Sequence, residues 1–311
     1  MANNSQYWLD RAIEVDKKDL ETEIKLWKEI CDLYEDAYKD TIEKIHAFYS
    51  KYGDEHGLSY QEAVKLLDPI ELKECSRRIK RLYKLKETID TSTPLGRQRA
   101  SQIQREIQLL RNRGRITREL ALLDSINEQW IETAYKIDEK LGDLVSSTYS
   151  REYTHALESA GVEKIILPVK TLESAILIPT FGDHFSDRVW KNKDKLLSFI
   201  RTELRRGLVE GTNVRKTTTK LMKQLDVTRY EARRLVVTEN AVARVNGSLE
   251  GYRASDVVEY LVVIEVMDAR TCPDCKDHDG DTIKLSNVIV GDNIPPFHPL
   301  CRGTVAPYFE D

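Results

Sequence analysis

The residues best suited to chemistry lie near the C-terminus, in two short pairs of potential metal ligands. Cys272 and Cys275 are separated by two residues, and so are His298 and Cys301, with 22 residues between the two pairs. Zn²⁺ at structural sites takes thiolate and imidazole donors in fours. The spacing therefore predicts one zinc site that these four side chains fill, with no open position for a reacting water molecule.

Prolines surround both pairs and would stiffen them. Pro273 lies inside the first pair, where its fixed φ restricts the turn. Pro295, Pro296 and Pro299 flank His298 and keep the preceding residues out of the helical region. A pair that is already rigid loses less conformational entropy when it binds an ion.

The same spacing leaves other interpretations open. Two turns with reduced thiols, or a disulfide, would also fit it. His278 and Asp279 lie between the pairs and are more typical of loop or outer-shell groups than of extra ligands. Cys31 and Cys75 are far from the cluster in sequence, and we interpret them as packing residues. An odd total of five cysteines does not favour a disulfide framework.

The sequence around the pairs carries a wider pattern. It reads Asp268-x-Arg270-Thr271-Cys272-x-x-Cys275, then Asp279-Gly280, then Pro295-Pro296-x-His298-Pro299-x-Cys301-Arg302. This pattern resembles the C-terminal domain of the phage minor head proteins, the head morphogenesis family similar to the F protein of phage Mu.

Two further segments extend the resemblance. Residues 237–247, continued by Glu250-Gly251-Tyr252, are similar to the helix that precedes the metal segment in that family, and Tyr7-Trp8-Leu9-Asp10-Arg11 is similar to the opening of Gram-positive phage members. The resemblance covers about residues 185–303. Gly303 departs from it, because the family often ends the motif with a cysteine there.

The resemblance implies a structural role without catalysis. It implies a low-copy minor head protein of a tailed phage that acts in procapsid and head assembly near the portal and influences DNA packaging or ejection. The implied partners are the portal protein and capsid or scaffold components. The implied location is the head interior or portal vertex of the virion, and the host cytoplasm during assembly.

The first half of the chain is predicted to form long helices. Two stripes with heptad spacing predict a long antiparallel helical hairpin or small bundle. The chain breaks between them at 53–59, at Asp68-Pro69 and at 91–96. The stripes are Leu20, Ile24, Trp27, Cys31, Tyr34, Tyr38, Thr41, Ile45, Phe48 and Ile116, Leu120, Leu123, Asn127, Trp130, Ala134, Ile137, Leu141, Leu144.

The second half has a different character. Helices are predicted at 184–209, 215–225 and 228–253, with Asp226 as the cap of the last one. Short strands are predicted at 257–266, 281–290 and 303–308. The expected fold is thus mainly α with a small α+β C-terminal domain pinned by zinc. The predicted division is a helical stalk at 1–150, a joint at 151–183 and a Mu F-like domain at 184–311.

Charge is distributed unevenly along the helical half. Residues 1–76 hold 10 Lys or Arg against 18 Asp or Glu, whereas residues 77–118 hold 13 against 3. Packing the two segments together would neutralise both. The alternative is that segment 77–118 contacts packaged DNA through Arg97, Arg99, Arg105, Arg111, Arg113 and Arg115, where phosphate contacts would be sensitive to salt.

Composition limits the remaining classes of protein. The chain has 32% charged residues and no long apolar run, so we expect no membrane span and no secretory signal. A net charge of −4 argues against a dedicated DNA-binding protein. A zinc-knuckle nuclease or DNA-binding module is the alternative function. A nuclease of the His-Asn-His type would need further histidines for its catalytic metal, and only His278 lies near the cluster.

Overall fold

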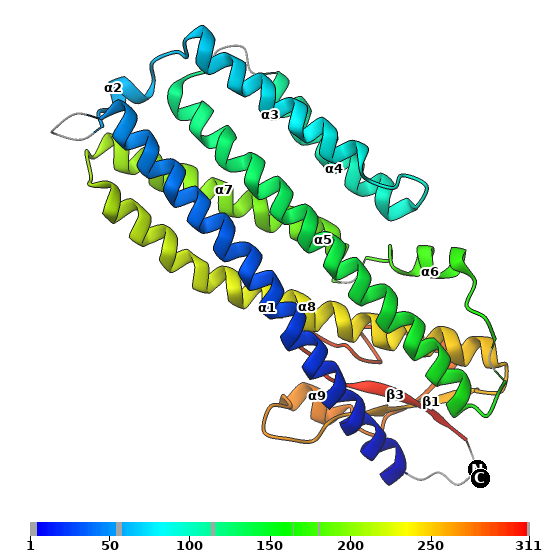
Figure 1. Cartoon of the computed structure of the whole chain (residues 1–311). Helices are drawn as coiled ribbons and strands as arrows, with labels where there is room; N and C mark the ends of the chain where they lie inside the picture. The colour runs from blue at the N-terminus through cyan, green and yellow to red at the C-terminus, as the bar shows by residue number, and fades with distance from the viewer. Residues whose placement is uncertain (1–4, 54–57, 113–115, 164, 180, 310–311) are drawn as a thin grey trace. The chain divides into compact units, whose positions relative to one another are not determined.

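A computed structural model describes residues 5–53, 58–112, 116–163, 165–179 and 181–309. The fold is mainly helical with a small antiparallel sheet near the C-terminus, which confirms the predicted fold class (Figure 1). The helices are α1 (Ser5–Tyr52), α2 (Tyr60–Ala63), α3 (Pro69–Glu87), α4 (Pro94–Arg111), α5 (Arg118–Ser159), α6 (Val169–Ala175), α7 (Phe185–Val209), α8 (Val214–Ser255) and α9 (Pro273–Asp277), and the strands are β1 (Tyr260–Ile264), β2 (Thr282–Lys284) and β3 (Thr304–Tyr308).

The chain forms two compact units, and each combines segments that are distant in sequence. The first, here called the sheet unit, contains residues 1–29, 139–185 and 231–311. The second, the helical unit, contains residues 30–138 and 186–230. Helices α1, α5 and α8 contribute residues to both. The predicted division at residues 150 and 184 follows the chain instead, and it stays a prediction.

In the helical unit, the two apolar stripes meet as an antiparallel pair of helices. Trp130 of α5 donates from Nε1 to Thr41 Oγ1 of α1 at 3.1 Å, and its ring meets Tyr38 edge-on with centroids 5.2 Å apart. Lys44 of α1 donates to the carbonyl of Ser125 at 2.9 Å. The residue numbers rise on α1 as they fall on α5, so the helices are antiparallel, as predicted.

The predicted stripe is wrong at the start of α1. Ile24 is 38% exposed, whereas Leu26 and Ile30 are buried. A straight α-helix has 3.6 residues per turn, so a strict heptad stripe drifts around it by about 20° per heptad. The buried face therefore moves to neighbouring positions over the length of a long helix.

Local signals place the helix starts of the helical unit correctly. Asp68 accepts hydrogen bonds from the backbone of Ile70 and Glu71 in a capping box at the start of α3. Thr93 caps α4 through Gly96 N at 3.0 Å. In both helices a proline occupies the first turn, where no backbone donor is lost to the helix.

The break predicted near residue 226 is wrong. Helix α8 runs continuously over Val214–Ser255, and Asp226 pairs with Arg229 at 3.2 Å on its exposed surface instead of capping a helix. Residues 214–246 contain neither glycine nor proline, so nothing in the backbone forces a stop. Helix α5 also extends to Ser159, so the predicted joint begins as helix.

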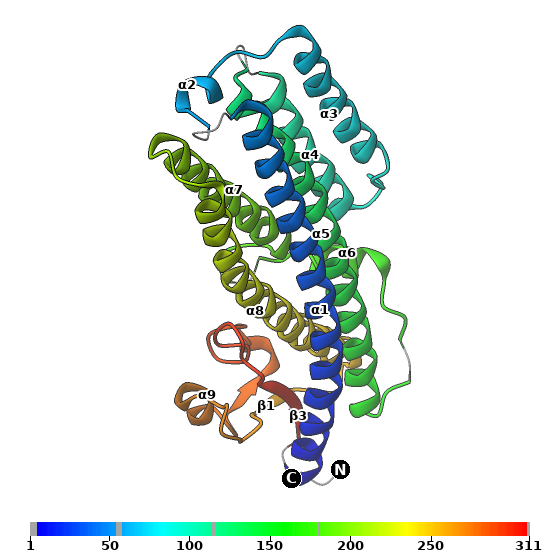
Figure 2. The same cartoon turned by 60° about the vertical axis from the view of Figure 1, so that its left-hand side comes forward.

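In the sheet unit, β1 is the central strand, in the order β2-β1-β3 with both pairings antiparallel. Figure 2 shows β1 beside β3. Leu261 and Val263 of β1 pack in a buried cluster with Val245 and Leu249 of α8. Alternate residues point to the opposite face of a strand. On that face Ile264 and Ala306 pack with Ala12 of α1, and Trp8 and Leu9 of the opening motif pack against the same cluster.

Two glycines of α8 allow a close approach to α5 in the sheet unit. A Cβ at Gly247 would lie 2.4 Å from the carbonyl oxygen of Tyr149, and one at Gly251 would lie 2.5 Å from that of Tyr153. Both distances are too short for real contacts, so any side chain would force the helices apart. These glycines belong to the segments that resemble the Mu F family.

Among the residues that the structure describes, no helix combines the length and apolar character that crossing a membrane requires.

Candidate metal centre

The two predicted ligand pairs lie in the segment between β1 and β3, which leaves β1 after Ile264 and enters β3 at Thr304. Cys272 caps the short helix α9 and Cys275 lies within it, while His298 and Cys301 lie in the loop that leads to β3. Sγ of Cys272 and Sγ of Cys275 each lie 3.1 Å from His298 Nε2. Cys275 Sγ lies 3.6 Å from Cys301 Sγ. Turns that are distant in sequence thus face one another, as predicted.

The donor atoms fit a metal ion in type, and those of Cys272, Cys275 and His298 lie within 4.8 Å of one another. A tetrahedral zinc ion with Zn–S bonds of about 2.3 Å separates its sulfurs by roughly 3.8 Å. The sulfurs of Cys275 and Cys301 are 3.6 Å apart, close to that value. His298 Nδ1 lies 2.8 Å from the carbonyl oxygen of Pro299. A proton on Nδ1 would be donated there, which leaves the lone pair of Nε2 directed at the two sulfurs.

The thiols have different electrostatic surroundings. Burial raises the pKa of Cys275 and of Cys301, and the neighbouring Glu265 carboxylate adds to the effect at both. The backbone N–H of Cys275 donates to Cys272 Sγ at 3.4 Å and lowers the pKa of that thiol. Buried thiols with raised pKa values ionise when a cation replaces the lost solvation. Binding of a metal ion here would therefore release the protons of Cys275 and Cys301.

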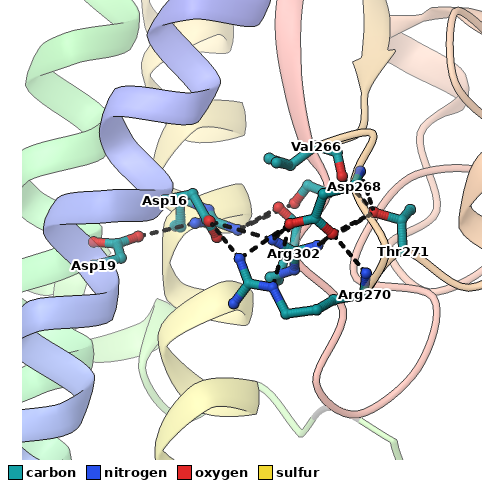
Figure 3. A network of polar contacts seen from close by, with 9 residues as sticks. Asp16, Asp19, Val266, Asp268, Arg270, Thr271 and Arg302 are labelled. Atoms are coloured by element: carbon teal, nitrogen blue, oxygen red, sulfur yellow. Dashed lines mark hydrogen bonds and ion pairs between the residues drawn. The ribbon is translucent and has the colours of Figure 1, made fainter.

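A polar network joins the two turns independently of any ion (Figure 3). Thr271 precedes Cys272 and donates to the carbonyl of Val266. Arg302 follows Cys301 and donates to Asp268 at 2.5 Å and 3.1 Å and to Thr271 at 3.2 Å. Arg302 holds the pKa of Asp268 well below its usual range. Charge-assisted bonds of this kind fix the relative positions of the turns that carry the ligands.

The same network reaches α1, as Figure 3 shows. Arg302 lies 3.3 Å and Arg270 lies 3.7 Å from Asp16. Deeper in the unit, Arg244 of α8 pairs with the buried Asp19 at 2.9 Å and donates to the carbonyl of Arg302 at 3.0 Å. Asp16 and Asp19 of α1 therefore fix the position of the loop that contains Cys301, directly through Arg302 and indirectly through Arg244.

Three consecutive polar residues of segment 237–247 are buried: Thr238, Glu239 and Asn240. Thr238 Oγ1 accepts a hydrogen bond from Leu300 N at 3.2 Å, which positions the residue before Cys301. Asn240 is fully buried, accepts from Thr148 at 2.7 Å and donates to Glu23 at 2.9 Å. These contacts assign the residues to packing inside the sheet unit.

His278 and Asp279 have partners other than the thiols. His278 stacks on Phe297 with ring centroids 4.3 Å apart and contacts Asp281 at 2.9 Å. Asp279 accepts a hydrogen bond from the backbone of Glu265 at 2.9 Å. Both side chains therefore shape the loop around the centre, in agreement with the interpretation that they are loop groups.

Sequence reasoning missed one acidic residue at the centre. Glu265 follows β1, is 1% exposed, and places a carboxylate oxygen within 4.8 Å of the sulfurs of Cys275 and Cys301. Burial, reinforced by the nearby charge of Asp279, raises the pKa of Glu265 to about 7. The sequence did offer a signal for this residue, because Glu265 is a charged residue placed directly after the apolar run 260–264.

Comparison with known proteins identifies the region that contains this centre. Residues 198–306 match the model of the family described as Phage Mu protein F like protein. The chain carries a Mu F-like region. That region contains α8, β1, β2, the first residues of β3 and all four predicted ligands. No curated protein and no solved structure matches the chain.

The match confirms the resemblance and changes the range of residues that it covers. The Mu F-like region begins inside α7 at residue 198, later than the residue 185 expected from the motifs. The opening motif at Tyr7–Arg11 lies outside the match, although Trp8 packs against β1 and β3 of the matched region.

Proposed function

We propose that this protein is a minor head protein that acts in procapsid and head assembly of a tailed phage, near the portal. The observation that carries the proposal is the Mu F-like match over residues 198–306. The matched family is one of structural head proteins, and this supports an assembly role rather than an enzymatic one. The location that follows is the virion head, with a stage in the host cytoplasm during assembly.

We further propose that the centre holds one structural Zn²⁺ through Cys272, Cys275, His298 and Cys301. The support is the donor geometry, with S–N distances of 3.1 Å and an S–S distance of 3.6 Å. A sheet of three short strands buries little apolar surface by itself, and structural zinc ions commonly stabilise modules of this size. When bound, the ion would hold together the turn of Cys272 and Cys275 and the turn of His298 and Cys301.

The assembly role predicts where the protein is found. Particles made from the genome that encodes this chain should contain it in both procapsids and virions, at an abundance far below that of the major capsid protein. Quantitative mass spectrometry of gradient-purified particles measures this ratio, with the major capsid protein as the internal standard. Absence of the protein from both kinds of particle would refute the assembly role.

Contacts with the portal protein and with capsid or scaffold components are part of the proposal. The sheet unit exposes several large apolar side chains around α6, including Ile166 at 82% and Val169 at 71% exposure. Exposed apolar clusters on soluble proteins often mark interaction surfaces. Segment 165–178 is therefore the part of the sheet unit that we expect to meet another head protein.

Contact with packaged DNA is a second candidate activity. Only some of the cations in the basic segment 77–118 pair with groups of the protein itself. Arg99 is paired with the buried Asp138 at 2.6 Å, and Arg81 is paired with Glu128 at 2.5 Å, so α5 neutralises part of the segment. Arg111 donates to Tyr83 at 2.9 Å. Arg113 and Arg115 lie outside the described residues.

Exposed cations also lie on one face of α3, and one of them, Arg77, pairs with the carboxylate of Glu74 at 3.3 Å. They recur at steps of four, three and four residues, which places them along one line of the helix. A continuous line of exposed cations can follow a phosphate backbone. The four residues are Lys73, Arg77, Lys80 and Lys84.

DNA contact through α3 predicts a specific salt dependence. Replacing all four α3 cations by glutamine should lower the slope of log affinity against log salt for duplex DNA by roughly three to four, since each lost phosphate contact removes about 0.9. Fluorescence anisotropy across a salt series measures the slope. The matched control replaces the exposed Lys17, Lys18, Lys25 and Lys28 of α1 by glutamine. Equal slopes for the two variants would rule out α3 as the contact.

A further inference from the structure

A buried carboxylate faces the thiol side of the metal centre. Glu265 lies directly after β1 and is 1% exposed. One of its carboxylate oxygens forms a compact group with Cys275 Sγ and Cys301 Sγ, in which all atoms lie within 4.8 Å of one another. Cys272, Cys275 and His298 form a second such group. The two groups share Cys275, so Glu265 and Cys301 adjoin the group of Cys272, Cys275 and His298.

The chain makes room for this carboxylate at Gly303. A Cβ at that position would lie 2.0 Å from Glu265 Oε1 and 2.7 Å from its carboxyl carbon. Both distances are far shorter than any real contact. A side chain at residue 303 would therefore require the Glu265 carboxylate to leave its present position, whereas glycine leaves that position free.

The carboxylate lacks a complete set of hydrogen bonds. Among the described residues, Glu265 Oε1 has no hydrogen-bond partner although it is buried. A buried acceptor without a partner costs about 1–3 kcal/mol, and more when it is charged. The negative charge of Asp279, whose carboxylate accepts from the Glu265 backbone at 2.9 Å, adds repulsion. A cation next to Oε1 would remove both penalties.

We propose that Glu265 is a ligand of the metal centre, in a donor group with Cys275 and Cys301. This inference rests on the proposed metal site and extends it. Zn²⁺ accepts carboxylate oxygens at about 2.0–2.2 Å alongside thiolate and imidazole. With Glu265 included, the centre offers one more donor than a four-coordinate ion requires. Loss of Cys301 would then leave four protein donors: Cys272, Cys275, His298 and Glu265.

The test uses the full-length protein with Zn²⁺ and Co²⁺ as probes. Glu265→Gln should weaken Zn²⁺ binding at least tenfold in competition with a chromophoric chelator. It should also change the visible absorption of the Co²⁺ form, which reports the number and type of ligands. Glu259→Gln is the matched control, because Glu259 is exposed at the opposite end of β1 and pairs with Lys284 at 3.0 Å. That variant should behave as the wild type.

Two results would overturn the inference. One is Zn²⁺ affinity in Glu265→Gln equal to that of the wild type. The other is weaker binding with an unchanged Co²⁺ spectrum, which would make Glu265 a positioning residue. If Glu265→Gln does not fold, Cys301→Ser decides. Retention of one Zn²⁺ per chain in that variant, with a Co²⁺ spectrum that indicates four protein ligands, supports Glu265 as a donor, and complete loss of Zn²⁺ overturns it.

The same measurements distinguish failure of the Glu265 assignment from failure of the four-ligand zinc site. Wild-type protein that binds one Zn²⁺ per chain while Glu265→Gln remains unaffected would leave the four-ligand centre standing and remove Glu265 from it. Wild-type protein that binds no Zn²⁺ would overturn the centre and the inference together. Neither result bears on the presence of the protein in phage particles, which mass spectrometry tests by itself.

Discussion

A Cys272→Ser/Cys275→Ser variant is expected to lose bound zinc completely, from about one ion per chain to none. The two sulfurs supply half of the proposed ligand set, and each lies 3.1 Å from His298 Nε2. Structural zinc contributes an apparent free energy of about 10–16 kcal/mol in short peptides, so the effect should be large. Elemental analysis gives the stoichiometry, and amide hydrogen exchange should show lost protection in α9, the sheet and the loop before β3.

The control for this variant is Cys31→Ser/Cys75→Ser. Both cysteines lie in the helical unit, away from the ligand pairs, and their replacement should leave the zinc content unchanged. Exchange rates in α3 and α4 should stay the same in the Cys272→Ser/Cys275→Ser variant, because those helices belong to the helical unit. Full zinc stoichiometry in the latter variant would show that the assigned ligands are wrong.

Asp138→Ala should destabilise the helical unit by about 3–5 kcal/mol, the usual cost of removing one partner of a buried ion pair. Asp138 is fully buried and receives hydrogen bonds from Arg99 at 2.6 Å, from Trp190 at 3.2 Å and from Ser186. Its loss leaves the guanidinium of Arg99, which is only 14% exposed, without a counter-charge. Urea denaturation followed by tryptophan fluorescence measures the change.

Asp143→Ala is the matched control for that measurement. Asp143 lies on the same helix but is exposed, so its replacement should change the stability by no more than about 0.5 kcal/mol. A loss below about 1 kcal/mol in Asp138→Ala would contradict the view that this carboxylate organises the contact between α4, α5 and α7.

Several features follow from short stretches of sequence. The caps at Asp68 and Thr93 were predictable because a cap and the backbone donors it binds lie within three residues of each other. The turn of Cys272 and Cys275 was predictable for the same reason. The buried faces of α1 and α5 were predictable from their apolar stripes, because an inward face repeats every three to four residues.

Other features depend on contacts between distant parts of the chain. The uninterrupted α8 was missed at Asp226 because a single polar residue is a weak local signal. The two compact units each interleave separate segments, which no composition shift marks. The basic segment 77–118 finds part of its counter-charge on α5, at Glu128 and Asp138, beyond the acidic segment 1–76.

The sequence by itself determined the types of the donors at the metal centre and their pairing, because each pair is set by a turn of four residues. Only the tertiary structure decided which further groups reach the centre. Glu265 is 36 residues from Cys301 in sequence, yet the pairing of β1 with β3 brings them together, and Gly303 leaves the space for the carboxylate. Strand register and side-chain volume are properties of the folded sheet, and neither can be read from the spacing of the ligands.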